Sequence, residues 1–492
     1  MDELPIREKT VPEDLTGTKR LASLDFQRGL AIWMMVFLHV FNHMVDYGAV
    51  DAGKLFSFEA GYGFFSSLFF VFAAFFGNWI GYFIIISAIV NAYATTKKAL
   101  AGTPPRRLFG KQILTGIGIL IAGAITEGFG YYGYFGAVLR SDHPFTAAAW
   151  TNPNIVNNIW RQFFHMEALQ IIGWCMIITA IIQYFLFIKG GASKYLRNII
   201  VLGSLTLVIF ILSPIIWNLV DNMSYWKIPT DPSLDPYHYS WPSDVFQPYN
   251  AGIVAYLLVI VAGDYYPLFP FLGASLLGAV IGTVLAKPNP PKRLPLWGLG
   301  LFLGLLVAGG ICAALLPFDI TFNRPYLGFF FFLTGGQVGA ILLFFYLVEW
   351  RGKSEKFAKN IVVKYFRTWG MIALTIFALQ IWSLAPRAAF NWTMSMNTMN
   401  ELIDPFTQKG WFGIVLLFAI ATVLFYDLLI WSWAQINFIG SYEWLIIKFS
   451  SLASKEPSNR LNFKYMLNKV DWMNYKPLIK PKEVDMDKAL NS

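Results

Sequence analysis

Long apolar segments, most of them near 20 residues, alternate with short polar segments along most of the chain. A helix needs about 20 apolar residues to cross the hydrocarbon core of a bilayer. The pattern therefore predicts an all-α fold, a polytopic transmembrane helical bundle of about ten spans with interfacial helices. The expected spans are residues 28–47, 66–95, 112–137, 161–188, 198–220, 266–286, 295–316, 326–350, 368–385 and 410–433.

Two apolar segments depart from the simple pattern. Residues 252–264 are too few to span and end at Asp264, which favours a re-entrant or interfacial piece before Tyr266-Pro267 restarts the helix. Residues 61–95 are too many for one straight span, so 61–76 are expected to form a separate interfacial helix.

Composition supports a membrane protein. Of 492 residues, 56% are hydrophobic and only 14% are charged, whereas about 25% charged residues are typical of soluble domains. Cys175 and Cys312 both fall inside expected spans, so we expect no disulfide framework. The spacing of His, Cys and carboxylates predicts no metal site. The net charge of +9 does not indicate nucleic-acid binding, because the basic residues follow the topology.

The basic residues also predict the orientation. Of the 38 Lys and Arg, 31 fall in the terminal and loop segments on one side of the expected membrane and 7 on the other. The positive-inside rule predicts that the side with 31 basic residues, which includes both termini, faces the cytoplasm of a multi-pass cell-membrane protein. We divide the chain into a cytoplasmic segment 1–20, a membrane domain 21–452 and a basic tail 453–492.

The tail has an amphipathic pattern, which indicates either a helix lying on anionic lipid or a disordered basic segment. Its apolar positions at helical spacing are Phe463, Met466, Leu467, Val470 and Met473.

The first span carries Arg28 and His39, eleven residues apart. This is about three helical turns, so both side chains lie on nearly one face, roughly 16 Å apart along the axis. Ionisable groups within a span are costly and often functional. A guanidinium binds phosphate or carboxylate, and an imidazole moves protons. The alternatives are a snorkelling anchor for Arg28 and a structural, hydrogen-bonded His39.

Other polar residues are expected at the depth of His39, in the outer half of the membrane. Asn42 and His43 extend its face outward. Arg161 and His165 are expected to share one helical face, and Glu167 and Gln170 another. A histidine beside a carboxylate is the usual arrangement of a general base, so Glu167 or Glu127 is expected to orient the His39 ring. The polar residues expected at this depth are His39, Asn42, His43, Glu127, His165, Glu167 and Gln170.

The segment SLDFQRGLAI, followed by His39, resembles the opening of the integral-membrane acyltransferases. These include the acyltransferase type 3 proteins, with their Arg and His eleven residues apart, and the heparan-alpha-glucosaminide N-acetyltransferase-like proteins. Four later segments are similar to the YeiB-like branch: HMEALQIIG, YPLFPFLGASLLGAVIG, GMIALTIFALQ and GSYEWL. Met371, Ile376 and Ser441 within them, and Ile447 just after the last one, depart from that branch's pattern.

The resemblance implies transfer of an acyl group, with acetyl expected, from cytosolic acyl-CoA to a sugar or other polar acceptor at or across the membrane. His39, His165 and Glu167 would be catalytic. The expected binding residues for donor and acceptor are Asp25, Arg28, Asn42, His43, Glu127 and Gln170.

Two other functions remain open. One is a secondary transporter of a small polar or anionic solute, since Pro267, Pro270 and Gly335-Gly336 are typical of broken helices. The other is a non-catalytic membrane subunit. Membrane lipids are expected partners in every case, and a homo-oligomer is left open.

Overall fold

The computed structural model describes most of the chain. The described residues are 19–46, 68–69, 72–73, 76, 79–221, 252–263, 265–288, 290–317, 325–394, 401–403, 410–454 and 460–475. Among them every regular element is a helix, and ten helical segments are long and apolar enough to cross a membrane. The predicted all-α, polytopic helical bundle is therefore confirmed.

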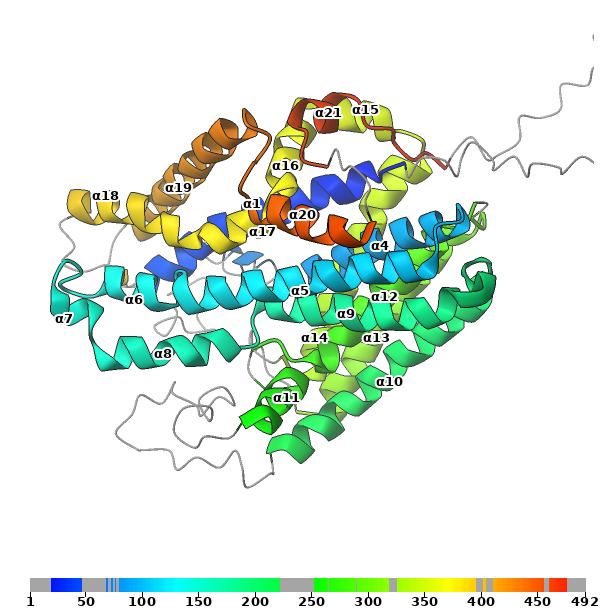
Figure 1. Cartoon of the computed structure of the whole chain (residues 1–492), viewed down its shortest axis with the longest axis horizontal. Coiled ribbons are helices and arrows are strands. Elements are labelled where there is room, and N and C mark those ends of the chain that lie inside the picture. The colour runs from blue at the N-terminus through cyan, green and yellow to red at the C-terminus, as the bar shows by residue number, and fades with distance from the viewer. Residues whose placement is uncertain are drawn as a thin grey trace, which may run out of the picture.

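The helices of the first half include the spans from α1 to α10 and a short unit, α6 to α8, at one end of α5 (Figure 1). Their bounds are α1 Ala22–Met44, α4 Ile80–Leu100, α5 Pro105–Phe129, α6 Tyr134–Arg140, α7 Ala147–Trp150, α8 Pro153–Phe164, α9 Ala168–Phe187, the 3-10 helix η3 Ile188–Ser193 and α10 Tyr195–Asp221.

The second half adds five further spans and several shorter helices. Their bounds are α11 Gly252–Ala262, α12 Leu268–Leu285, α13 Leu294–Leu315, α14 Leu327–Phe345, the π-helical turn η6 Tyr346–Trp350, α15 Ser354–Lys359, α16 Ile361–Met371, α17 Ala373–Ala378, η7 Leu379–Ser383, α18 Leu384–Met394, α19 Trp411–Ala434, α20 Tyr442–Ser454 and α21 Phe463–Asn468.

The predicted spans lie close to the observed ones, although several ends are shifted, three of them as follows. The first helix begins at Ala22, so Arg28 lies in its second turn instead of at its start. The second span begins at Ile80, and most of the interfacial helix expected at 61–76 lies outside the described residues. The ninth runs to Met394, well into the expected outer loop.

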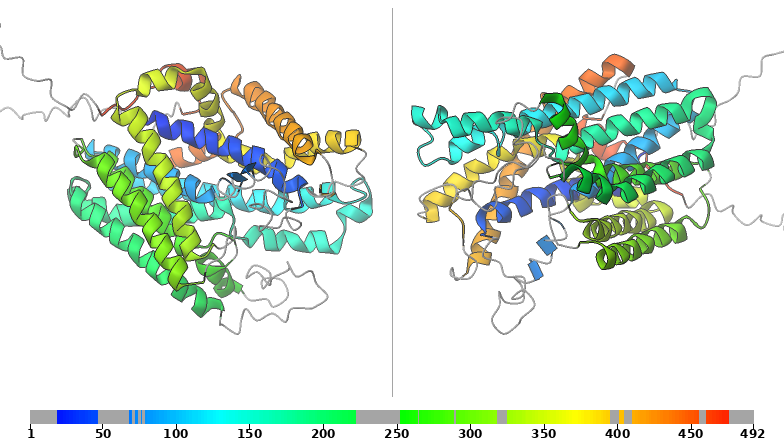
Figure 2. Two further views of the ribbon diagram at one scale, coloured as in Figure 1. Left: turned by 180° about the vertical axis from the view of Figure 1, so that it is seen from behind. Right: turned by 90° about the horizontal axis from the view of Figure 1, so that it is seen from below.

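Close helix packing builds the core around α12. The pairs α4–α12, α5–α9, α10–α12 and α13–α14 pack along much of their lengths, as the views in Figures 1 and 2 show. Gly278 and Gly282 let α12 approach α4, because a Cβ at Gly282 would lie 2.4 Å from the Ile89 carbonyl oxygen. Small residues at such contacts are typical of membrane helices.

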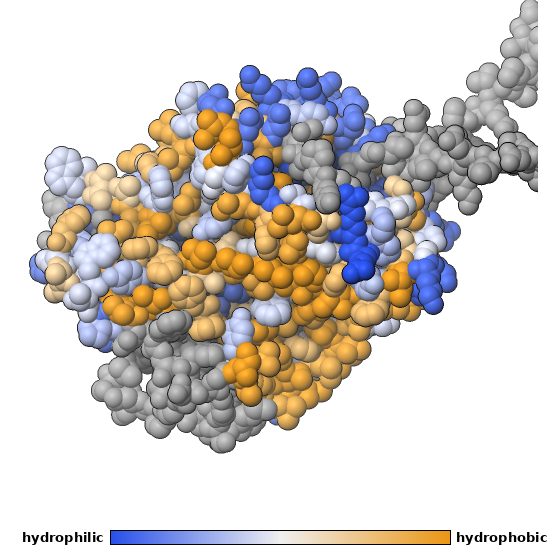
Figure 3. All heavy atoms as spheres, viewed as in Figure 1, coloured by the Kyte–Doolittle hydropathy of each residue, from blue (hydrophilic) through white to orange (hydrophobic). Residues whose placement is uncertain are grey.

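The outward faces of the spans are apolar. Exposed leucine, isoleucine and valine side chains follow α10 and α13. Figure 3 shows apolar side chains across the middle of one face and hydrophilic ones gathered at the top, where α15 and α21 lie. This distribution suits a bundle surrounded by lipid along its spans.

The two ends of the described chain lie side by side. The Arg20 backbone N–H donates to the Asp471 carbonyl at 2.9 Å, and the Met473 N–H donates to the Arg20 carbonyl at 2.9 Å. Tyr475 is buried and its hydroxyl donates to the Leu285 carbonyl at 2.8 Å. Residues 460–475 thus pack on the bundle, with Met466 buried against protein.

Two further interpretations have structural outcomes. Residues 252–262 form α11, a helix of 11 residues and therefore about 16 Å long, too short to span. Gly335-Gly336 lie within α14, which continues through them without a break. The expected broken helix at these two glycines was wrong.

Candidate functional site

Arg28 lies in a network of charged groups at the N-terminal end of α1. Asp25 accepts two hydrogen bonds from the Arg20 guanidinium, each of 2.8 Å. One Arg28 nitrogen is 3.8 Å from the same carboxylate, and Arg28 Nε donates to the Gly370 carbonyl at 2.9 Å. Arg28 is therefore fixed by two elements, the Asp25 turn of its own helix and the end of α16.

Glycine makes the contact between Arg28 and α16 possible. A Cβ at Gly29 would lie 1.6 Å from the Phe366 carbonyl oxygen, so only glycine fits at this crossing. The facing residue, Gly370, is also close to the α1 backbone, since a Cβ there would lie 3.1 Å from the Gly29 nitrogen. The adjacent Arg28 and Gly29 thus act together. Gly29 allows the backbone of α16 to come close, and Arg28 donates a hydrogen bond to that backbone.

Glu443 joins two of the later segments to the same region. Its carboxylate accepts from the Leu374 N–H at 2.6 Å and the Thr375 N–H at 3.3 Å, and it also accepts from the Thr375 hydroxyl. These N–H groups belong to the first turn of α17, so Glu443 caps that helix after the break at Ile372. Burial raises the pKa of Glu443, while these hydrogen bonds act in the opposite direction.

Basic groups outnumber acidic ones at this end. Arg460 interacts electrostatically with Arg28, Arg20, Glu443 and Asp25. Arg367 donates to the carbonyls of Ala358 and Met466 and stacks on Trp472, with its guanidinium 4.4 Å from the ring centre. Four guanidiniums therefore gather near the carboxylates of Asp25, Glu349 and Glu443. The arrangement can bind an anion.

His39 lies near the other end of α1 and is half-buried. Its Nδ1 is 2.7 Å from the Met35 carbonyl oxygen. Because a carbonyl only accepts, Nδ1 carries a proton, and in the neutral imidazole Nε2 then carries the lone pair. The expectation that Glu127 or Glu167 orients this ring was wrong, since a backbone carbonyl one turn earlier does so.

His43 continues from His39 toward a pair of tyrosines. The two histidine rings are 5.7 Å apart. His43 Nε2 is 2.8 Å from the Tyr132 hydroxyl, and the His43 ring stacks on Tyr131 at 4.2 Å. Asn42 is exposed. We expected Asn42 to extend this polar face, but the structure leaves it outside the contacts that join the two histidines.

His165 and Glu167 meet at a break that the sequence did not reveal. α8 ends at Phe164 and α9 begins at Ala168, so the two residues lie between helices, where we had expected one continuous span. His165 Nε2 is 3.8 Å from Glu167 Oε1, although we had expected these side chains on different helical faces. Glu167 also accepts from the Ala168 N–H at 3.1 Å, which caps α9.

Glu127 and Gln170 are buried beside this break, on α5 and α9. Glu127 and Glu167 are close enough to interact electrostatically, and both interact with Tyr132. Tyr132 therefore connects His43 to the two carboxylates. The expected convergence of His39, His43, Glu127, His165 and Glu167 is supported by ring and side-chain contacts from His39 to His43, from His43 to Tyr132 and from Glu167 to His165. Tyr132 also interacts electrostatically with Glu127 and Glu167.

The Gln170 amide is only 5% exposed, and neither its oxygen nor its nitrogen has a hydrogen-bond partner among the described residues. Buried amides are nearly always bonded, so such a group marks a place where a polar ligand or water fits. Sequence reasoning selected Gln170 for its position and missed Tyr131 and Tyr132. The adjacent tyrosines directly after α5 were the signal available for them.

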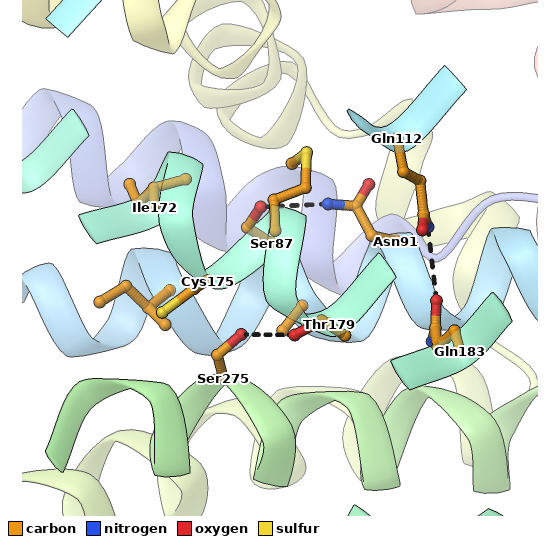
Figure 4. Close-up of a pocket in the computed structure, with 11 residues that line it drawn as sticks. Ser87, Asn91, Gln112, Ile172, Cys175, Thr179, Gln183 and Ser275 are labelled. Carbon is orange, nitrogen blue, oxygen red and sulfur yellow. Dashed lines mark hydrogen bonds between the residues drawn. The ribbon is translucent and has the colours of Figure 1, made fainter. Parts of the chain in front are cut away.

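A separate small cavity lies between α4, α5, α9 and α12 (Figure 4). Its volume is about 20 Å³, which is room for about one water molecule. Polar side chains face it: Gln112 donates to Gln183 at 3.4 Å, and the Thr179 and Ser275 hydroxyls are 3.5 Å apart. None of the predicted site residues lines it.

Within the described ranges, no three His, Cys, Asp or Glu side chains are grouped so that they could hold a metal ion. No family model, no curated protein and no solved structure matches the chain. The resemblance in the first segment therefore rests on its residues alone.

Proposed function

We propose that this chain is a membrane-embedded acyltransferase. It moves an acyl group, with acetyl expected, from cytosolic acyl-CoA to a sugar or other polar acceptor at or across the cell membrane. Both termini lie in the cytoplasm under this proposal, because 31 of the 38 basic residues fall on their side.

One observation supports the proposal most. A single helix, α1, carries Arg28 within an arginine cluster at one end and a histidine with a free Nε2 lone pair near the other. A coenzyme A thioester carries its phosphates far from its reactive carbonyl. The arginine cluster suits the phosphates, and the histidine suits the carbonyl.

The donor phosphates would bind at the arginine cluster. Arg28 uses Nε to hold the Gly370 carbonyl, which orients its terminal nitrogens. Guanidinium–phosphate hydrogen bonds are charge-assisted and hence stronger than neutral ones. Arg20 and Arg460 are the basic groups that interact electrostatically with Arg28 in the structure.

His39 would act as the general base. Its Nε2 takes the proton from the acceptor hydroxyl or amine as the acceptor oxygen or nitrogen forms a bond to the thioester carbonyl carbon. The carbon–sulfur bond then breaks, and the thiolate leaves and takes up a proton to give coenzyme A. His165, paired with Glu167 at 3.8 Å, is the alternative base in the same polar region.

The acceptor would bind near the break between α8 and α9. Glu127, Glu167 and Tyr132 supply charged and polar groups there, and the Gln170 amide offers both a donor and an acceptor that are unpartnered in the described structure. A polyhydroxylated sugar presents matching hydroxyl groups.

The testing experiment uses the purified full chain in nanodiscs. Calorimetric titration with acetyl-CoA should show saturable binding, and mass spectrometry of a panel of sugars and amino sugars should show a product heavier by one acetyl group. Absence of acetyl-CoA binding would remove the proposed donor and with it the acyl-transfer assignment.

A secondary transporter is the second candidate, because the helix break at Ile372 favours it. α16 ends at Met371 and α17 begins at Ala373, and the freed backbone groups are bound by Arg28 and Glu443. Transporters often place charged groups at such breaks. Solute counterflow in proteoliposomes without acetyl-CoA binding would favour this function.

A further inference from the structure

Arg387, on α18, is a buried arginine whose hydrogen-bonding groups are mostly unused. Only 4% of the surface of Arg387 is exposed to solvent. One terminal nitrogen donates to the Glu401 carbonyl at 2.6 Å. The other terminal nitrogen and Nε have no hydrogen-bond partner among the residues that the structure describes.

The surroundings of Arg387 carry positive charge. It interacts electrostatically with Tyr131 and with His43, which stack on each other at 4.2 Å. Arg140 lies over the same tyrosine ring, with its guanidinium 4.7 Å from the ring centre. Glu401, an exposed residue, is the acidic group that interacts with Arg387. Two guanidiniums thus approach one aromatic pair.

A second buried arginine shows what a structural role looks like in this protein. Arg367 is also 4% exposed. Both its terminal nitrogens donate to backbone carbonyls, of Ala358 and Met466, and its guanidinium stacks on Trp472. Arg387 lacks such a set of partners.

Burial of a charged donor without partners costs free energy, so it needs a reason. A guanidinium is planar and presents parallel N–H groups that match the two oxygens of a carboxylate or phosphate. Arg387 leaves Nε and Nη1 unused, and because these two groups point in different directions, each can donate its own hydrogen bond to an anion oxygen. The parallel pair that includes Nε is completed by Nη2, which already donates one of its two N–H groups to the Glu401 carbonyl.

We propose that Arg387, with Arg140 and the His43–Tyr131 pair, forms a binding site for a carboxylate or phosphate group at the end of α1 opposite Arg28. This inference rests on the proposed acyl transfer, in which the ligand of the site is an anionic acceptor, such as a uronic acid or a phosphorylated glycan or lipid. The site gives a role to the two guanidinium nitrogens that have no hydrogen-bond partner among the described residues, beside the predicted catalytic histidines.

The experiment measures the melting temperature of the full chain in phosphatidylcholine nanodiscs, by intrinsic fluorescence, against rising inorganic phosphate or glucuronate. Glucose is the uncharged control. The variants are Arg387→Met, which keeps the apolar stem, Arg351→Met at an exposed arginine, and Arg367→Met. A parallel arm replaces part of the phosphatidylcholine with phosphatidylglycerol, which separates a lipid phosphate from a soluble anion.

For the wild type and Arg351→Met, we expect a saturable rise in melting temperature with phosphate or glucuronate, or with phosphatidylglycerol. Arg387→Met should weaken the apparent affinity by about 10-fold to 100-fold. Without ligand, Arg367→Met should melt lower than Arg387→Met, because it loses two hydrogen bonds and a stacked ring within the protein, whereas Arg387→Met loses one hydrogen bond.

An unchanged anion response in Arg387→Met, or no response of the wild type to any of the three anionic probes, would overturn the site. The assay contains no acyl-CoA. Anion binding without acyl transfer would therefore keep the site and reject the acyltransferase, and acyl transfer without anion binding would do the reverse.

Discussion

A backbone carbonyl sets the chemistry of His39. The 2.7 Å contact between Nδ1 and the Met35 oxygen leaves Nε2 as the proton acceptor. Sequence reasoning found the Arg28–His39 spacing, since eleven residues on one helix can be counted. It could not find the partner of the ring, because any backbone carbonyl one turn away competes with the distant carboxylates that we had favoured.

The burial of Arg387 is a second feature that the sequence could not predict. It was expected in the loop 386–409, where a basic residue is ordinary. The structure extends α18 to Met394 and buries Arg387. Its environment depends on where a helix ends, and sequence patterns locate ends least well.

We predict that His39→Ala lowers the rate of acetyl transfer about 10²-fold to 10⁴-fold, because a general base of this kind contributes that much. Acetyl-CoA binding should persist, since the arginine cluster lies at the other end of α1. The measurement is the rate of acetylated product by mass spectrometry. His143→Ala, at an exposed histidine, is the matched control. A wild-type rate in His39→Ala, with loss of activity in His165→Ala or His43→Ala, would move the base elsewhere in the polar region.

A second residue-scale prediction concerns the donor. Arg28→Ala should weaken acetyl-CoA binding about 10-fold to 100-fold, the range for a hydrogen bond to a charged group. Calorimetry on the purified protein measures it, with Arg351→Ala as the control at an exposed arginine. An unchanged affinity would exclude Arg28 from the donor site.

At the scale of elements, the helices that cross one another explain the later family-like segments. Gly370 at the end of α16 meets Gly29, and Glu443 caps α17. These residues are distant in sequence and form one junction around Arg28. The ten spans could be predicted because apolar length is a local property. The break at 165–167 could not, because the Met166 carbonyl accepts instead from the Tyr266 N–H, 3.1 Å away on another segment.

The junction gives a prediction about packing. Gly29→Ala should destabilise the bundle, because the added Cβ would lie 1.6 Å from the Phe366 carbonyl oxygen and must push α16 away. Overpacking of this kind typically costs about 1–3 kcal/mol. The melting temperature in nanodiscs measures the effect. Gly304→Ala is the matched control, since a Cβ there meets nothing within 4 Å. Equal melting of both variants would contradict the close crossing.

At the scale of the whole molecule, the chain brings its two ends together. Arg20 exchanges backbone hydrogen bonds with Asp471 and Met473, and Tyr475 is buried between spans. Residues 460–475 therefore close the end of the bundle where Arg28 lies. The amphipathic spacing in this tail was visible in the sequence. That the apolar side of the tail packs on the bundle depends on tertiary contacts, which no local pattern encodes.

The last prediction concerns the orientation of the chain, that is, the side of the membrane on which the Arg28 end of the bundle lies. The distribution of basic residues places it in the cytoplasm. In a chain with Cys312→Ser, and with Cys175 already buried, a membrane-impermeant maleimide should label Phe145→Cys from outside the cell, because Phe145 is 94% exposed at the opposite end. Lys356→Cys, at an exposed position on α15, should react only after the membrane is permeabilised. The reverse pattern would invert the topology, expose Arg28 to the outside, and separate it from the cytosolic acyl-CoA that the proposed reaction requires.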